Sequence, residues 1–261
     1  MERHDSFWIV TTERPSFPAL SRDLFVDVAI VGGGIVGIMA ATFLKEGGKT
    51  VAVIEARRVA EGVTGHTTAK VTSLHTLVYD ELISKFGEGK ARLYGESNQA
   101  AIRIIGELCQ ERAIDCDFKE TTAYTYTVVD DYIAKIEKEV EAARSLGLPA
   151  QYHDDMPLPY PVKAAVSFTG QAKFHPRKFL LPLIASVPGD GSHVFENTRV
   201  IGIEEGEPCR VSTGKGNVIT AKADRDRDAS PSGWASRLDP SPKTMPGPSP
   251  RATAPSSCRA P

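Results

Sequence analysis

Three glycines with the spacing of a phosphate-binding turn are the residues of this chain best suited to chemistry. Gly32, Gly34 and Gly37 fit the pattern G-x-G-x-x-G, with Gly33 between the first two. In such a turn the first glycine allows a tight bend, the second lets the backbone approach a pyrophosphate, and the third lets a helix pack closely on a strand. Glu55 follows 23 residues after Gly32, where a carboxylate can accept a hydrogen bond from a ribose 2′-hydroxyl. These residues predict a dinucleotide site, and the acid disfavours the 2′-phosphate of NADP.

Apolar runs on both sides of the glycines predict the elements that position them. Residues 28–31 and 51–54 are rich in β-branched side chains, as is typical of buried parallel strands. Between them, residues 38–45 predict a helix that ends at the two glycines 47 and 48. In this β-α-β unit the helix N-terminus would present its free N–H groups to phosphates. Both FAD and NAD bind such a unit, so the pattern alone leaves the choice open.

A second loop of small residues, 61–70, follows the acid. It is too polar for a core and includes Thr64, Gly65, His66, Thr67 and Thr68. A second close approach of the backbone to a long cofactor would explain it, and so would a capped surface loop. The spacing alone favours neither interpretation.

The rest of the chain up to residue 222 alternates helical and strand-like patterns. Helices are predicted over 79–112 (two, broken near residues 87–89), 131–146 and 177–187. Strands are predicted over 118–129, 162–168, 193–203, 209–213 and 218–222, the last three as a meander. Together with the β-α-β unit, these elements predict the α/β class.

Composition and charge exclude several classes of protein. The 261 residues carry 31 Lys and Arg against 33 Asp and Glu, which leaves no basic excess to bind nucleic acid. The four cysteines, at 109, 116, 209 and 258, form no CxxC pair, so neither a disulfide scaffold nor a metal site is expected. The N-terminus shows no secretory signal pattern. The uncharged run 28–44 has 17 residues, fewer than the ~20 of a membrane span. We therefore expect a cytoplasmic protein without metal, nucleic acid or membrane partners.

The last 38 residues, 224–261, differ from the body of the chain. They hold 8 of the 18 prolines and 7 serines, and their only large apolar side chains are Trp234, Leu238 and Met245. Such a segment buries too little surface to offset its ordering entropy, so we expect a disordered tail. The predicted organisation is one folded unit over 1–223, followed by this tail.

Several segments of the chain resemble one known family. They are DVAIVGGGIVGIMAATFLKEGGKTVAVIEA, GVTGHTTAKVTSLH, LYGESNQAAI, IDCDF, GQAKFHPRKFLLPL and FENTRVIGIEEGEPCRV, which together span nearly all of residues 6–223. This pattern resembles the D-amino-acid-oxidase-like (DAO) family of FAD-dependent oxidoreductases. It is most similar to the bacterial subgroup in which the module precedes a C-terminal Rieske iron–sulfur domain.

The resemblance implies a Rossmann-like FAD-binding domain with an interleaved α+β substrate domain. It also implies FAD as cofactor, a small amine or amino acid as substrate, and oxidation of a C–N bond by hydride transfer to the flavin. The flavin carries that reaction while the protein positions the substrate, so no catalytic base is assigned.

Site residues follow from the resemblance position by position. The three glycines of the turn would hold the pyrophosphate, and Glu55 the adenosine ribose. Residues 64–68 would lie along the pyrophosphate toward the flavin, with His66 as a candidate cofactor contact. The backbone of Val200 would meet the adenine. His75 and His175 are expected to be structural, the latter at a helix start.

The resemblance stops abruptly after Ala223. Family members continue with an apolar strand, whereas this chain continues with Asp-Arg-Asp-Arg-Asp. Codons for residues 225–230 read one nucleotide later can encode Val-Thr-Val-Thr-His-Pro, so we expect a reading-frame change near residue 224, with a natural disordered tail as the alternative. The domain would then be incomplete at its C-terminus and without a Rieske module, whose centre needs two Cys and two His.

Three functions remain open at this point. The leading one is a truncated FAD-dependent amine or amino-acid oxidoreductase of reduced activity. The alternatives are an NAD-linked dehydrogenase and a non-catalytic dinucleotide-binding remnant.

Overall fold

The glycine turn follows directly after one strand of a three-stranded parallel sheet. The structure is a computed structural model that describes residues 6–13 and 15–222, so the predicted tail lies outside the described residues. The sheet has the order β2-β3-β8, with β2 at Val28–Val31, β3 at Val51–Ile54 and β8 at His193–Phe195. Every residue of the central strand β3 is buried, as expected for a parallel strand covered on both faces.

Two layers cover the faces of this sheet. On one face, Val51 and Val53 belong to a core cluster with α2 (Ile35–Glu46) and α6 (Pro176–Ala185). On the other face, Ala52 and Ile54 pack in a cluster with a second sheet. That sheet has the order β1-β11-β10-β9. Its strands are β1 (Leu24–Val26), β9 (Val200–Glu204), β10 (Cys209–Thr213) and β11 (Val218–Ala221).

The prediction of one strand over 193–203 is wrong. The segment divides into β8, which joins the parallel sheet, and β9, which joins the meander. Between them Asn197 takes a positive φ of 50°, and Thr198 donates its backbone N–H to the Glu55 carbonyl at 2.9 Å. The meander itself is confirmed for β9, β10 and β11, which pair in antiparallel order.

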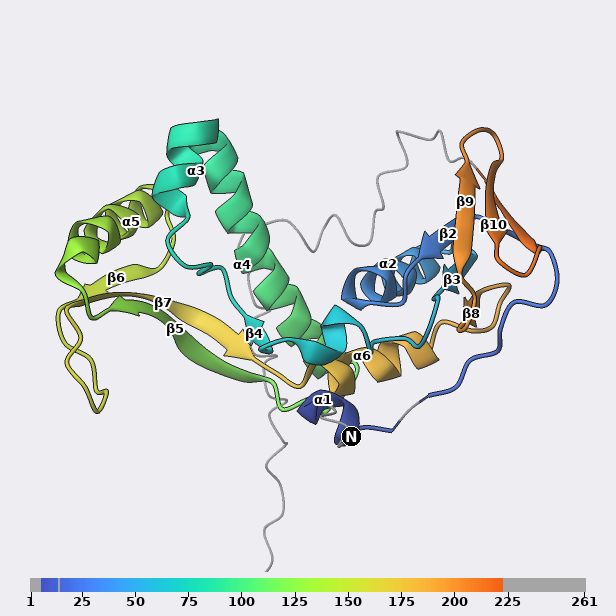
Figure 1. Ribbon diagram of the computed structural model, residues 1–261, viewed down its shortest axis with the longest axis horizontal. Helices are drawn as coiled ribbons and strands as arrows, with labels where there is room; N and C mark the ends of the chain where they lie inside the picture. The colour runs from blue at the N-terminus through green and yellow to red at the C-terminus, as the bar shows by residue number, and fades with distance from the viewer. Residues whose placement is uncertain (1–5, 14, 223–261) are drawn as a thin grey trace, which may run out of the picture.

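A separate antiparallel sheet forms the second lobe of the molecule (Figure 1). Its strands are β4 (Lys70–Val71), β5 (Lys119–Thr127), β6 (Ala150–His153) and β7 (Ala164–Lys173). The helices α3 (Tyr79–Phe86) and α5 (Ile133–Ser145) cover one face of it, where Val140 and Ala143 pack with Val166 and Phe168. The predicted α/β architecture with an interleaved α+β unit is confirmed.

The long helix α4 (Glu88–Glu111) runs from this lobe to the parallel sheet (Figure 1). Gly87, with φ of +81°, separates it from α3, as the sequence predicted. Short elements complete the chain: α1 (Phe7–Val10) and the 3-10 turns η1 (Val63–His66) and η2 (Asp130–Tyr132). None of the helices in the described ranges is long and apolar enough to cross a membrane.

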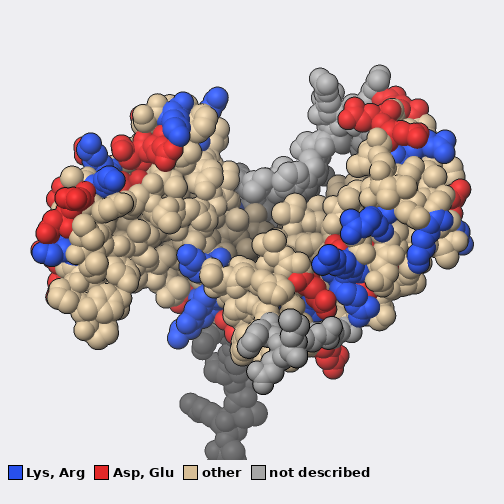
Figure 2. Space-filling view, in the orientation of Figure 1, with Lys and Arg blue, Asp and Glu red and all other residues tan. Residues whose placement is uncertain are grey.

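Charged side chains gather on the outer surfaces of the two lobes in the space-filling view (Figure 2). A broad notch separates the lobes, and in this view its walls carry mostly uncharged side chains. The elements on either side of the notch are α4 and α2 (Figure 1).

The buried carboxylate of Glu139 links two helices of the second lobe. From α5 it accepts backbone N–H groups at the start of α3, from Val78 at 2.8 Å, Tyr79 at 2.9 Å and Asp80 at 3.1 Å. The side chain is 1% exposed. It therefore satisfies donors that the first turn of a helix cannot pair internally, and its charge opposes the positive end of the helix dipole.

We expect Glu139→Ala to lower the free energy of unfolding by about 3 kcal/mol, because three N–H groups at the start of α3, including that of the buried Tyr79, would lose a charged acceptor. The exposed Glu137 on the same helix provides the control, and Glu137→Ala should change stability by less than about 0.5 kcal/mol. Urea unfolding of both variants measures the difference. Equal effects of the two substitutions would contradict the assigned role of Glu139.

Candidate dinucleotide site

The glycine turn has the geometry that its sequence pattern predicts. Gly32 has φ of +106°, and its N–H continues the sheet by donating to the Ile54 carbonyl at 2.9 Å. A Cβ atom on Gly37 would lie 2.0 Å from the Gly32 carbonyl oxygen. The helix therefore approaches the strand more closely than any side chain at Gly37 would allow.

The carboxylate of Glu55 lies at the carboxyl end of β3, against the same turn. Its Oε2 accepts the Gly33 N–H and its Oε1 accepts the Arg57 N–H, both at 2.8 Å. A Cβ on Gly33 would lie 3.2 Å from the Cβ of Glu55 and 2.8 Å from the Val59 side chain. The absence of a side chain at Gly33 thus lets the acid meet the turn, and two N–H donors hold the carboxylate in place.

Thr64 brings the second predicted loop onto the start of α2. Its hydroxyl oxygen accepts the N–H of Ile35 at 3.1 Å. Gly34 is the N-cap of this helix, and a Cβ there would meet only Thr64 Oγ1 at 3.4 Å. Within the described ranges, the N–H groups of Gly34 and Val36 have no acceptor. Unpaired N–H groups at a helix N-terminus with open space above Gly34 fit the pyrophosphate of a dinucleotide.

The other residues of the loop have different surroundings. Gly65 is buried, and a Cβ there would lie 3.2 Å from the Ile9 side chain of α1. His66 is exposed, with Nδ1 2.9 Å from the Gly62 carbonyl oxygen. The Thr67 carbonyl accepts the indole N–H of Trp8 at 2.8 Å, and Thr68 is exposed.

Val200 lies at the start of β9, half-buried against the cluster that contains Ile54. The structure thus brings together the glycine turn, Glu55 and Thr64. Gly65 and Thr67 contact α1 instead. Val200 follows two residues after Thr198, whose N–H donates to the Glu55 carbonyl.

Two buried charged residues, which the sequence patterns did not indicate, hold the segment between Glu55 and Thr64. Arg177 from α6 donates to the Ala60 carbonyl at 2.9 Å and to Thr12 Oγ1 at 2.8 Å. Glu196 accepts the Val59 N–H at 2.9 Å and forms a salt bridge with Arg58 at 3.1 Å. Their partners lie more than a hundred residues away in sequence, so no local pattern could reveal them.

His175 caps α6, as expected of a structural histidine. Its Nδ1 accepts the Lys178 N–H at 3.2 Å, and its Nε2 lies 2.9 Å from Thr11 Oγ1. Burial lowers the pKa of His175, and the nearby charge of Lys178 lowers it further. Protonation of Nδ1 would remove the acceptor that caps the helix.

The folded protein should therefore lose stability as the pH falls below 6.5, the ordinary histidine value. Below that pH the unfolded chain binds a proton that folded His175 does not accept until its own lower pKa is reached. The loss between pH 7.5 and 5.5 should be at most about 1.4 kcal/mol. His175→Asn keeps a capping side chain without the titration. Urea unfolding at both pH values should give a smaller pH dependence for this variant; an identical dependence would contradict the assignment.

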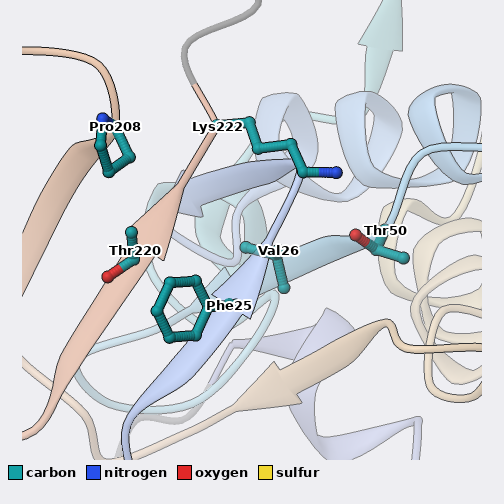
Figure 3. A pocket seen from close by; sticks show the side chains of 6 residues that line it. All are labelled: Phe25, Val26, Thr50, Pro208, Thr220 and Lys222. Atoms are coloured by element: carbon teal, nitrogen blue, oxygen red, sulfur yellow. The ribbon is translucent and has the colours of Figure 1, made fainter.

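A cavity of about 360 Å³ lies away from the glycine turn (Figure 3). Its lining comes from β1, β11 and the residues beside them: Phe25, Val26, Thr50, Pro208, Thr220 and Lys222. Val26 and Thr50 precede the parallel strands β2 and β3, so this cavity is at the amino ends of the sheet. Ligands of open α/β sheets bind at the carboxyl ends, where the glycines and Glu55 lie.

Comparisons with known proteins agree with this geometry. A family model for FAD-dependent oxidoreductases (DAO) matches residues 27–225. YhfW of Bacillus subtilis, which is named as a Rieske 2Fe-2S iron-sulfur protein, is 41% identical over 221 residues, covering 85% of this chain and 43% of that protein. The gamma-glutamylputrescine oxidoreductase of Escherichia coli is 27% identical over 212 residues, covering 79% of this chain and 49% of that protein.

The same fold occurs in solved structures. Glycine oxidase from Geobacillus kaustophilus superposes with a TM-score of 0.63 at 18% identity, covering 77% of this chain and 54% of that one. The chain spans about half the length of the relatives it matches. Family model, identity and fold agree, and the resemblance stated from the sequence is confirmed: the chain belongs to the DAO family of FAD-dependent oxidoreductases.

Proposed function

We propose that this chain is the FAD-binding part of an oxidoreductase that oxidises a C–N bond of an amine or amino acid. FAD, when bound, supplies the acceptor for the hydride that leaves the substrate carbon. The observation that carries the proposal is the meeting of the glycine turn, the Glu55 carboxylate and Thr64 at the carboxyl ends of β2 and β3. The names of the E. coli relative and of the glycine oxidase neighbour support the substrate class.

Each group of residues has a distinct part in this proposal. Gly32, Gly33, Gly34 and Gly37 bring the backbone and the N-terminus of α2 to the pyrophosphate. Glu55 accepts a hydrogen bond from the adenosine ribose. The segment from Thr64 to Thr68 lies along the pyrophosphate toward the flavin, and the Val200 backbone faces the adenine.

A cytoplasmic location is part of the same proposal. The cysteines within the described ranges, Cys109, Cys116 and Cys209, are free thiols. Free thiols are the usual state in the reducing cytosol.

The proposal is tested by the cofactor of the purified chain and by its reduction. We expect flavin absorbance, release of FAD on denaturation, and anaerobic bleaching by at least one member of a panel of amines and amino acids. Binding of NAD instead of FAD would overturn the proposal. FAD that no member of the panel reduces would favour a non-catalytic remnant.

Glu55→Ala should weaken FAD binding by about 1–3 kcal/mol, or roughly 5–150-fold in Kd, because it removes one charged acceptor from the ribose. Glu55→Gln keeps an acceptor without the charge and should have an intermediate effect. Calorimetric titration of the apoprotein with FAD measures both. Glu204→Ala, at an exposed acid in β9, is the control. An unchanged Kd for Glu55→Ala would remove Glu55 from the proposed contact.

A further inference from the structure

Two buried thiols lie side by side where α4 meets the turn into β5. The sulfur atoms of Cys109 and Cys116 are 3.3 Å apart. Cys109 is in the last turn of α4 and is 9% exposed, while Cys116 precedes β5 and is 1% exposed. Both belong to the apolar cluster that also contains residues of α2 and α6, and neither is hydrogen-bonded to the glycine turn or to Glu55.

The backbone holds the two cysteines in this arrangement. The Cys109 carbonyl accepts the N–H of Ile114 at 2.9 Å, which closes the chain directly after α4. The Cys116 carbonyl accepts the N–H of His175, the N-cap of α6, at 2.6 Å. Ala113 and Asp117 take positive φ angles of 50° and 56°, so a tight path returns the chain to the helix. The proximity of the sulfur atoms is therefore set by backbone contacts on both sides.

We propose that Cys109 and Cys116 are a redox pair that forms a reversible intramolecular disulfide when a hydroperoxide oxidises it. A disulfide bond is about 2.05 Å long, so the sulfur atoms must approach by roughly 1.3 Å. Side-chain rotation alone can supply a movement of this size. The cross-link would join the end of α4 to Cys116, whose carbonyl accepts the N–H of His175 at the start of α6.

The chemistry proceeds in two balanced steps. The more exposed thiol, Cys109, takes one oxygen atom from hydrogen peroxide to form a sulfenic acid, and one water molecule is released. The Cys116 sulfur then attacks the Cys109 sulfur, the S–S bond forms, and the oxygen leaves as a second water molecule. The peroxide is reduced by two electrons, and the thiol pair is oxidised by two.

Burial sets the rate and the persistence of this reaction. It raises the pKa of both thiols, that of Cys109 to about 12, so little reactive thiolate is present at neutral pH. We therefore expect slow oxidation compared with an exposed cysteine. The same burial protects the finished disulfide from other thiols.

The test uses the full chain carrying Cys209→Ser and Cys258→Ser, so that only the pair remains. The folded protein is treated with hydrogen peroxide for a series of times that extends well beyond full oxidation of the more exposed Cys209 in the unsubstituted chain. Free thiols are then counted in denaturant, and the peptides are analysed by mass spectrometry. We expect the number of free thiols to fall from two to zero and the mass of the chain to decrease by two hydrogen atoms. The protein should remain a monomer and yield a peptide that contains the Cys109–Cys116 cross-link. Dithiothreitol should restore both thiols.

The single variants Cys109→Ser and Cys116→Ser, in the same background, provide the matched controls. Each keeps one thiol and should give no intramolecular cross-link. Two thiols that persist in the folded pair chain would overturn the proposal, and so would addition of oxygen atoms without a cross-link. Neither result bears on FAD binding, which is measured separately by flavin absorbance.

Discussion

Replacing Gly34 by valine should abolish FAD binding while leaving the fold intact. Gly34 has φ of −86° and ψ of −173°, an extended conformation that valine adopts without strain. A Cβ there would meet only the Thr64 hydroxyl at 3.4 Å, so the protein itself has room for it. The added methyl groups would occupy the space above the N–H groups of Gly34 and Val36, where the pyrophosphate is proposed to lie. We expect a loss of at least about 100-fold in affinity, equivalent to roughly 3 kcal/mol.

Gly37→Ala separates a binding defect from a folding defect. Its Cβ would lie 2.0 Å from the Gly32 carbonyl oxygen, a backbone atom that cannot move without distorting the turn. This variant should lose about 3 kcal/mol of stability or more. Thermal unfolding and bound flavin are measured for both variants. Unchanged flavin retention in Gly34→Val would contradict the proposal that the pyrophosphate binds at this turn.

The second large effect concerns the outer edge of β2. Within the described ranges β2 pairs only with β3, and Val31 at its end is 52% exposed. The strand β1, which directly precedes β2, pairs in parallel with β11, and this pairing ends where Ala221 lies opposite Val26. The chain then leaves β11 at Lys222, whose N–H donates to the Val26 carbonyl at 3.2 Å. A strand that continued in this direction would lie beside β2. An unpaired apolar edge exposes backbone groups and favours aggregation.

We therefore expect a chain that continues past Lys222 with an apolar strand to bind FAD better than the 261-residue chain. Val-Thr-Val-Thr-His-Pro, the shifted-frame reading proposed for residues 225–230, begins such a strand. Both chains are purified and compared for FAD per protein molecule and for reduction by an amine. The extended chain should hold FAD in a larger fraction of its molecules than the 261-residue chain does. Equal flavin content and turnover in the two would show that the added segment is dispensable.

Local patterns were sufficient to predict the central part of the fold. The β-branched runs of β2 and β3, the glycines between them and the helix stop at Gly47 all depend on near neighbours in sequence. The position of Glu55 at the end of the second strand also rests on a short spacing, whereas its hydrogen bond from the Gly33 N–H was not predicted. The break at Gly87 follows from glycine alone.

Elements whose stability depends on distant partners were not predicted. The strand β6 is only four residues long with mixed polarity, and pairing with β7 defines it. The division of 193–203 depends on a turn at Asn197 that alternating apolar residues conceal. Charged residues are expected outside a core, so the burial of Arg177 and Glu139 could not be predicted without knowing their hydrogen-bond partners.

The helix α4 restricts how the two lobes can move relative to one another. Its 24 residues span about 36 Å, and its two ends are fixed in different cores. Ala91 packs in the cluster of the second lobe, whereas Ile102 and Leu108 pack with α2 and α6. A continuous helix anchored at both ends resists bending, so the two lobes should move as one body and not as jaws about a hinge. Small-angle X-ray scattering should then give the same radius of gyration with and without FAD.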